Sequence, residues 1–419
     1  MICLLPHCAY LSETSRMLEL HRALIELGLP VRVATHGGPH ERLLAGLQYD
    51  VLGPGLSPAR AARFVGSAVG LGDPRQSMYD DDEIRSYAQT EAEYFRAHGI
   101  TVAVTGFTIT TLLSSRLAGV RLITEHAGSF VPPVFEKRLL PAPTHPVDPR
   151  LKRAPQWLSR FLINRTVNRT TSYCGGFNRV AESLGVEGVP SLSALLLGDL
   201  SLVPEIPEVL GVSAAELAAW TPEGRVGYRP SSRLTGVGPL FAHLDLPLPD
   251  RVQKFLDRPG PTIYLAMTST APAQVHAAIT SLATLDVRLL VAGTIHDLGD
   301  LAIDRIMIEG TLPSHLVMPQ VDLAITTAGQ GSTQTAMASG TPLLGIPLHP
   351  EQDLNIALLE RLGAARHATP ATNLATLAAE MLDTPTHRDA AVQIQKLYAA
   401  VDGPAQAAQA IASAATSRA

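Results

Sequence analysis

The residues best suited to chemistry lie in one stretch, TTAGQGSTQTAMASGTPLLGIPLHPEQDLN, residues 326–355. Here Gly329 and Gly331 keep side chains away from a turn between an apolar, strand-like run and a helical pattern. The first N–H groups of a helix carry partial positive charge and have no partner within the helix. We therefore expect a phosphate-bearing ligand at the N–H groups of Gly331, Ser332 and Thr333. The hydroxyls of Ser332 and Thr333 would add two donors to phosphate oxygens. Tight strand-to-helix packing also requires glycine, so the turn alone leaves that alternative open.

The segment from Asp322 to Ala364 resembles the donor-binding signature of inverting glycosyltransferases with two Rossmann-like domains. Two branches fit: the nucleotide-sugar-dependent transferases of small natural products, and the related enzyme that adds N-acetylglucosamine to the lipid-linked peptidoglycan precursor. The family pattern is a strand, a His-Gly-Gly turn, Thr or Ser, a helix, G-x-P on the next strand, and Asp-Gln followed by Asn. The chain matches at Gly329, Gly331, Ser332, Thr333, Gly340, Pro342, Pro347, Gln352 and Asn355.

The resemblance also implies which residues would hold the donor diphosphate. The family histidine, which resembles a diphosphate ligand, is Thr327 here, and the first glycine is Ala328. Because a threonine offers one donor and no positive charge, the diphosphate would depend more on the helix start and on the loop MTSTAP. In that loop, Thr268 and Ser269 match the family's Gly-Ser pair.

Further positions would contact the sugar and the nucleobase. Glu351 replaces the family aspartate, and Glu351 and Gln352 would hydrogen-bond hydroxyls of the donor sugar; polarity at a helix N-terminus is the alternative. The stretch TLPSHLVMPQVDLAI resembles the segment that brackets the base. Leu316 and Val317 would meet the base through backbone groups.

In the N-terminal part, a carboxylate stands where the family has its catalytic histidine. Counting back from Gly28 in AYLSETSRMLELHRALIELGLPVRVAT places Glu13 at that position, and Arg16 matches an arginine of the peptidoglycan branch. The aspartate that orients the histidine would follow the strand TVAVT, where the chain has Gly106. A carboxylate base needs no partner to fix a tautomer. We therefore expect Glu13 to take the acceptor's proton; a first-turn Glu that favours the helix dipole is the alternative.

Two histidines and one acidic string are further candidates. His7 and His126 lie at predicted strand ends and are alternative bases. The string YDDDE at 79–83 satisfies the Asp-x-Asp pattern of a metal site, but no apolar strand precedes it. We expect no metal and no cofactor beyond the nucleoside-diphosphate sugar, because a helix start can neutralise the departing diphosphate.

These residues must be positioned by alternating strands and helices. MICLLPHCA, VRVATHGG, ITVAVTGF and VRLITEH read as strands, with Ser12 as the expected N-cap of the first helix. After a proline-rich stretch at 190–261, read as a rim segment and linker, strands recur as TIYLAM, VRLLVA, RIMIEG, VDLAIT and PLLGIP. Such alternation predicts an α/β fold with parallel sheets.

The expected architecture is two Rossmann-like domains facing across a cleft, the GT-B arrangement of the family. We expect an acceptor-binding domain at 1–240, a donor-binding domain at 241–400, and a last helix at 401–419 that crosses back. The resemblance is strong over 262–400, moderate over 1–125, and absent from about 127 to 235, where acceptors bind in such enzymes.

Amino-acid composition limits the classes of binding partner and the cellular compartment. The formal charge of −5 argues against a nucleic-acid binder with a broad basic face. Residues 150–179 contain arginines and no acid, which is typical of a soluble surface and leaves membrane contact as the less favoured alternative. Three cysteines without metal spacing, and an N-terminus without the features of a signal peptide, predict a cytoplasmic protein.

The sequence therefore predicts a metal-independent, inverting glycosyltransferase that moves a sugar from a UDP- or dTDP-sugar to a small acceptor. Two alternatives remain open. One is a nucleotide-sugar epimerase or hydrolase, which needs acid and base groups on both sides of the sugar. The other is a catalytically silent partner that binds nucleotide sugars.

Overall fold

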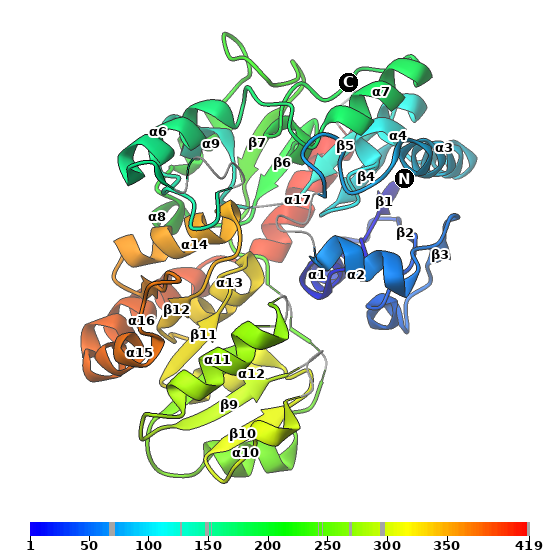
Figure 1. The fold of residues 1–419 in the computed structure, drawn as a ribbon. Coiled ribbons are helices and arrows are strands. Elements are labelled where there is room, and N and C mark those ends of the chain that lie inside the picture. Colours follow the sequence, from blue (N-terminus) through cyan, green and yellow to red (C-terminus); the bar gives the residue numbers. More distant parts are fainter. Residues whose placement is uncertain are drawn as a thin grey trace. The chain divides into compact units, whose positions relative to one another are not determined.

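Contacts between residues divide the chain into two compact units, each built on one sheet covered by helices (Figure 1). The computed structural model describes residues 1–66, 72–125, 128–146, 151, 153–241, 243–244, 246–267, 270–293 and 298–416. The first unit comprises Met1–Leu139, Arg160–Leu240 and Asp402–Ala419, and the second comprises Leu140–Ser159 and Phe241–Val401. The expected α/β class with two Rossmann-like sheets is confirmed.

The first unit contains a seven-stranded parallel sheet in the order β3-β2-β1-β4-β5-β6-β7. Its strands are β1 (Ile2–Leu4), β2 (Val31–Thr35), β3 (Asp50–Val51), β4 (Val102–Thr105), β5 (Arg121–Thr124), β6 (Leu200–Val203) and β7 (Arg233–Gly236). Its helices include α1 (Leu11–Glu26), α2 (Pro58–Gly66), α3 (Asp81–Ala97), α4 (Thr111–Ala118), α5 (Pro132–Glu136), α7 (Gly175–Leu184), α8 (Pro207–Leu210), α9 (Ala214–Ala219) and α17 (Gly403–Thr416). Helix α6 (Gln156–Thr166) begins among residues of the second unit.

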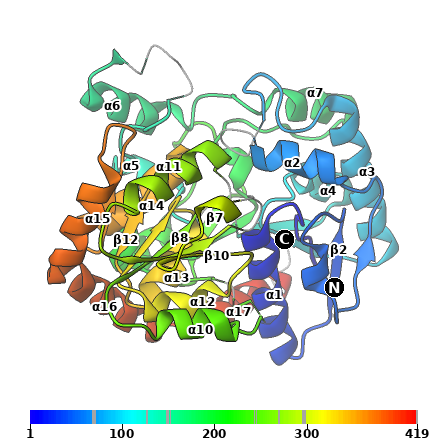
Figure 2. The same cartoon turned by 60° about the horizontal axis from the view of Figure 1, so that its bottom comes forward.

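The second unit contains a six-stranded parallel sheet in the order β10-β9-β8-β11-β12-β13. Its strands are β8 (Thr262–Ala266), β9 (Arg288–Ala292), β10 (Ile306–Glu309), β11 (Leu323–Thr326), β12 (Leu343–Gly345) and β13 (Ala365–His367). Its helices include α10 (Asp250–Leu256), α11 (Pro272–Leu282), α12 (Ser314–Val317), α13 (Gln330–Ala338), α14 (Pro350–Arg361), α15 (Leu374–Asp383) and α16 (Pro385–Ala399). Figure 2 shows α15 and α16 side by side on the outside of this unit.

Strand order reverses once in each sheet, and this fixes where ligands can bind. In the first sheet the chain runs from β1 outward through β2 and β3, then returns to β4 on the other side of β1. In the second sheet the same reversal falls between β8 and β11. Connections leave such neighbouring strands in opposite directions, so a crevice forms at their carboxyl ends, and ligands of open α/β sheets bind there.

The proline-rich stretch at 190–261 is not only a rim and linker, which corrects the sequence interpretation. It contributes β6 and β7, the two last strands of the first sheet. Each strand is four residues long, and the prolines lie outside both, so the pattern was too short to detect. The expected cap Ser12 is also wrong, since α1 begins at Leu11 with Tyr10 as N-cap.

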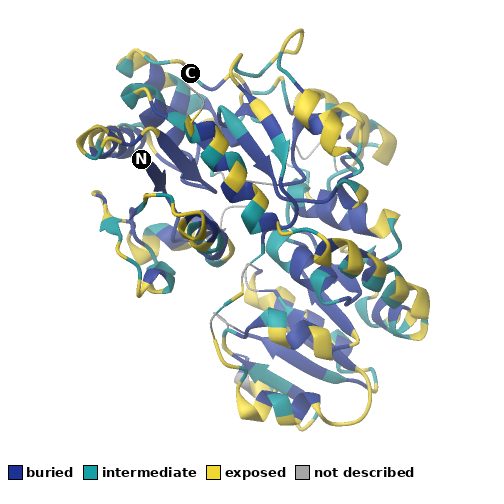
Figure 3. Ribbon diagram, turned by 180° about the vertical axis from the view of Figure 1, so that it is seen from behind, coloured by how far each residue is buried: buried dark blue, intermediate teal, exposed yellow. Residues whose placement is uncertain are grey.

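The last helix belongs to the core of the first unit. Helix α17 packs along α1 and beside β6, and four of its residues join the cluster under the sheet: Ala407, Ala408, Ile411 and Ala414. The strands are buried while the outer faces of the helices are exposed (Figure 3). Burial of this apolar stripe is the force that holds the chain's end on the first sheet.

Replacing Ile411 with Ala tests this packing. Ile411 is fully buried, so the variant should lose about 2–5 kcal/mol of the free energy of unfolding of the first unit. Ile25→Ala is the matched control, because Ile25 lies in the same unit, is 50% exposed, and its loss should cost under about 1 kcal/mol. Chemical denaturation measures both; equal effects would show that α17 is not part of the core.

Candidate functional site

The turn after β11 presents a helix start at the reversal point of the second sheet. Gly329 is the N-cap of α13, with extended backbone (φ −64°, ψ 152°), and Gly331 and Ser332 are partly exposed. The N–H of Thr333 donates to the carbonyl of Gly329 (3.0 Å), and its hydroxyl donates to the carbonyl of Gln330 (2.9 Å). Both donors of Thr333 are therefore used inside the helix, which corrects the expectation that they face a ligand.

The residue before the N-cap adopts a conformation that glycine would favour. Ala328 has φ 59° and is fully buried, at the position where the resembling family has its first glycine. A left-handed backbone costs a residue with a Cβ about 1–2 kcal/mol. Two hydrogen bonds stabilise it: the Ala328 N–H donates to Thr326 Oγ1 (3.0 Å), and the side-chain amide of Asn355 donates to the Ala328 carbonyl (3.0 Å).

Gln352 holds the same turn from α14. Its side-chain carbonyl accepts the N–H of Leu348 (2.8 Å), and its amide nitrogen lies 3.4 Å from Thr327 Oγ1 as a donor. Gln352 is 6% exposed and Thr327 is 9% exposed, whereas Glu351 beside them is partly exposed. The geometry thus gives Gln352 a structural task and leaves the carboxylate of Glu351 nearer the surface. The contacts proposed for both with a sugar stay predictions.

Helix α14 is fixed in turn by a buried carboxylate. Asp353 is 1% exposed and accepts two hydrogen bonds from Thr144, one from its N–H (3.0 Å) and one from its hydroxyl (2.6 Å). The Thr144 hydroxyl also lies 3.0 Å from His367 Nε2 on β13. Residues Leu140–Ser159, which we expected within the N-terminal domain, are thereby attached to the second unit.

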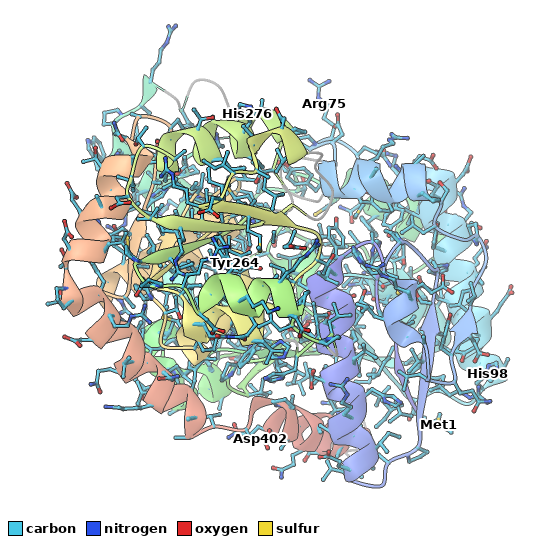
Figure 4. All side chains as sticks on the ribbon, turned by 90° about the horizontal axis from the view of Figure 1, so that it is seen from below. Met1, Arg75, His98, Tyr264, His276 and Asp402 are labelled. Carbon is cyan, nitrogen blue, oxygen red and sulfur yellow. The ribbon has the colours of Figure 1, made fainter. Side chains whose placement is uncertain are left out.

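The segment expected to bracket a nucleobase is helical. The N–H groups of Leu316 and Val317 both donate to the carbonyl of Pro313 (2.8 and 3.2 Å), so these two groups are not available to a base. Val317 is buried and Leu316 is 39% exposed. Tyr264, labelled in Figure 4 within the second sheet, anchors the segment through a 3.0 Å hydrogen bond between its hydroxyl and that of Ser314.

In the first unit, Glu13 lies at the reversal point between β1 and β4. Its Oε2 accepts the N–H of His7 (2.7 Å), and its Oε1 accepts the N–H groups of Gly106 and Phe107 (both 3.1 Å). Glu13 is 2% exposed. Burial raises its pKa to about 7, although Arg16 and the backbone N–H groups oppose this shift. Both oxygens are engaged, so the geometry favours a structural role over proton abstraction.

The same contacts explain the glycine at 106. A Cβ at Gly106 would lie 2.5 Å from Glu13 Cγ and 2.6 Å from Glu13 Oε1. The side chain of Glu13 therefore fills the space that a side chain at 106 would need. The two departures from the family's His-Asp pair are therefore coupled, because Glu13 in this position requires a glycine at 106.

His7, the alternative base, lies in an apolar environment. Its Nε2 is 3.0 Å from the hydroxyl of Tyr79, and its ring contacts Tyr10, Phe64 and Phe107. Burial lowers the pKa of His7 to about 3. The side chain lines a small cavity with Tyr79 and is neutral at physiological pH. A proton transferred to it would create a poorly solvated cation.

An ion pair that the sequence analysis missed lies at the end of β5. Arg16 Nε donates to Glu125 Oε1 (2.6 Å), and the two residues are 6% and 0% exposed. Burial raises the pKa of Glu125, against the effect of Arg16. The signal available in the sequence was an acid directly after a predicted strand, in VRLITEH.

Three predicted site residues, His126, Thr268 and Ser269, lie outside the described residues. The acidic string at 79–83 begins α3: Asp80 caps it and forms a capping box with Glu83, while Asp81 pairs with Arg179. Within the described ranges, no three His, Cys, Asp or Glu side chains are grouped to hold a metal ion. Within the same ranges, every helix is too short or too polar to cross a bilayer.

Comparison with known proteins finds glycosyltransferases in both sequence and structure, although no family model matches the chain. The oleandomycin glycosyltransferase of Streptomyces antibioticus is 34% identical over 70 residues, 17% of this chain and 16% of that protein. The NDP-glycosyltransferase YjiC of Bacillus licheniformis is 30% identical over 67 residues, 16% and 17% of the two chains. The matched stretches thus span less than a fifth of either relative.

Solved structures match nearly the whole chain. The glycotransferase of kitacinnamycin has a TM-score of 0.65 at 18% identity and covers 98% of both chains. The glycosyltransferase VinC in complex with dTDP has a TM-score of 0.63 at 16% sequence identity, and the match covers 99% of both chains. The rhamnosyltransferase SpnG with spinosyn aglycone has a TM-score of 0.61 at 16% sequence identity. The match covers 98% of this chain and 99% of SpnG. The chain has the fold of these glycosyltransferases. The resemblance expected from the motif is confirmed.

Replacing Gly106 with Ala tests the coupling with Glu13. The added Cβ clashes with the Glu13 side chain, so the variant should lose about 1–3 kcal/mol of unfolding free energy. In a Glu13→Ala background the same change should cost much less, which a double-mutant cycle measures. Gly310→Ala is the control, because nothing lies within 4 Å of a Cβ at Gly310. Additive effects would contradict the coupling.

The raised pKa of Glu13 predicts how stability depends on pH. Folding raises this pKa from 4.5 to about 7, so the folded protein binds the proton more tightly than the unfolded chain between these values. The free energy of unfolding should fall as the pH rises from 4.5 to about 7, by roughly 3 kcal/mol for this group. Glu13→Gln should lack this component. Denaturant titrations of the wild type and Glu13→Gln across this pH range measure the difference. The same pH dependence of the unfolding free energy in both proteins would contradict the raised pKa of Glu13.

Proposed function

We propose that the protein is an inverting, metal-independent glycosyltransferase that moves a sugar from a nucleoside-diphosphate sugar to a small acceptor. One observation carries the proposal: the start of α13, with small, partly exposed residues, lies at the β8/β11 reversal point of a sheet whose fold is that of nucleotide-sugar enzymes. Backbone N–H groups at a helix start stabilise the charge that develops on a departing diphosphate.

The donor is proposed to be a uridine- or thymidine-linked sugar. The diphosphate would contact Gly331 and Ser332, with Thr268 and Ser269 supplying further donors from the neighbouring loop. Glu351, partly exposed at the N-terminal end of α14, would accept hydrogen bonds from sugar hydroxyls. The dTDP in the VinC structure supports this choice, because that chain shares the fold over its whole length.

The acceptor is proposed to be a small natural product rather than a macromolecule. The structure of SpnG with spinosyn aglycone and the similarity to an oleandomycin transferase support a hydrophobic acceptor. The net charge of −5 gives no broad basic face for nucleic acid. Three buried thiols, Cys3, Cys8 and Cys174, form no disulfide, which supports a reducing compartment such as the cytoplasm.

Titration with UDP and dTDP tests the donor site. Ser332→Tyr places a large side chain over the start of α13 and should weaken binding of the preferred nucleotide at least about tenfold, which corresponds to about 1.4 kcal/mol. Ser339→Tyr, at the other end of the same helix, is the control and should bind as the wild type does. Equal affinity of wild type and Ser332→Tyr would reject the assigned pocket.

Transfer itself is tested with a panel of UDP- and dTDP-sugars and small hydroxylated acceptors, with conjugates detected by mass spectrometry. An enzyme also releases free nucleoside diphosphate slowly by hydrolysis of the donor, whereas a silent binding partner releases none. Binding without any release would favour the silent partner.

A further inference from the structure

The carboxyl edge of the first sheet holds two buried carboxylates that differ in one respect. Glu13 accepts three backbone N–H groups and uses both oxygens. Glu125, directly after β5, is held through Oε1 alone, by Arg16 Nε at 2.6 Å. Its Oε2 is buried and has no hydrogen-bond partner among the residues that the structure describes. A buried carboxylate oxygen without a donor is rare, because leaving it unsatisfied costs about 1–3 kcal/mol or more.

We propose that Glu125 is the general base of this protein and that its Oε2 receives the proton of the attacking acceptor. The proposal rests on the glycosyltransferase function proposed above. The acceptor oxygen forms a bond to the anomeric carbon while the bond from that carbon to the diphosphate oxygen breaks. The electron pair of the broken bond leaves with the nucleoside diphosphate, and the acceptor's proton moves to Glu125 Oε2.

The surroundings of Glu125 fit this task. A base is effective when a third group fixes its orientation, and Arg16 does so by holding the other oxygen. Arg16 and Glu13, both on α1, are the charged groups whose fields act on this site. Burial raises the pKa of Glu125, and a carboxylate with a raised pKa is a stronger base. Glu13 then serves as a positioning residue that fixes the ends of β1 and β4.

The other two candidates fit less well. Glu13 already accepts three backbone N–H groups, so only one lone-pair site, on Oε2, remains for a proton. His7 would have to become a cation among Tyr10, Phe64 and Phe107, although burial already lowers its pKa to about 3.

Donor hydrolysis with and without azide tests the proposal. Water needs a base in order to attack the anomeric carbon, whereas azide is an anion at neutral pH and needs none. UDP-glucose and dTDP-glucose are the probes, and release of nucleoside diphosphate and formation of glucosyl azide are measured. Glu125→Gln should slow hydrolysis at least about 100-fold, the usual contribution of a general base. With azide, release should return to within about threefold of the wild-type rate with azide.

Two further variants separate catalysis from folding. Glu125→Asp keeps the charge opposite Arg16 but withdraws the oxygen, so it should fold, lose hydrolysis at least about tenfold, and keep the azide reaction. If Glu125→Gln does not fold, the result for Glu125→Asp decides whether Glu125 is the general base. Glu91→Gln removes another fully buried carboxylate, bonded to His36 and Ser114, and should keep normal hydrolysis.

The outcomes distinguish the base from the function. If Glu125→Asp folds and keeps wild-type hydrolysis, the assignment is wrong. An equal loss of hydrolysis and of the azide reaction would also reject it, because that pattern indicates damaged positioning. If the wild type releases nucleoside diphosphate neither with water nor with azide, although it binds the donor, the proposed function fails, and the base assignment fails with it.

Discussion

The carboxylate of Glu13 joins the ends of β1 and β4 at the point where the strand order of the first sheet reverses. Parallel strands leave unpaired N–H groups at such a point, and a bound anion commonly satisfies them. Here the anion belongs to the chain itself. In the second sheet the corresponding point carries small residues and a helix start instead. One reversal point is therefore filled from within, and the other has groups that suit an external phosphate.

This constraint decides which side chains remain for proton transfer. A histidine at position 13 would need an aspartate at 106, and Glu13 occupies the space where that side chain would lie. Glu13 alone holds the ends of the two strands. Under the proposed function, another group at the same edge takes the acceptor's proton. Arg16, on the same helix as Glu13, faces Glu125 on the neighbouring strand end, so the change at Glu13 leaves an oriented carboxylate within the same unit.

Sequence patterns predicted the two sheets and the turn between β11 and α13, because strand runs such as VDLAIT and glycine positions depend on local rules. They did not predict β6 and β7, which are short and lie among prolines. They also assigned Thr333, Leu316 and Val317 to a ligand, although helix geometry uses their N–H groups internally. The Glu125–Arg16 pair joins residues 109 positions apart, and no local pattern reports such a contact.

The turn between β11 and α13 keeps its shape although Thr327 and Ala328 differ from the pattern of the resembling family. Ala328 keeps the left-handed backbone that a glycine would adopt without strain. Asn355 binds its carbonyl, and Gln352 binds Thr327 and Leu348, so two residues of α14 supply the stabilisation. The Gln and Asn of the pattern therefore stabilise the turn itself. Because α14 is itself fixed by the hydrogen bonds between Asp353 and Thr144, the shape of this turn depends on a residue from the middle of the chain.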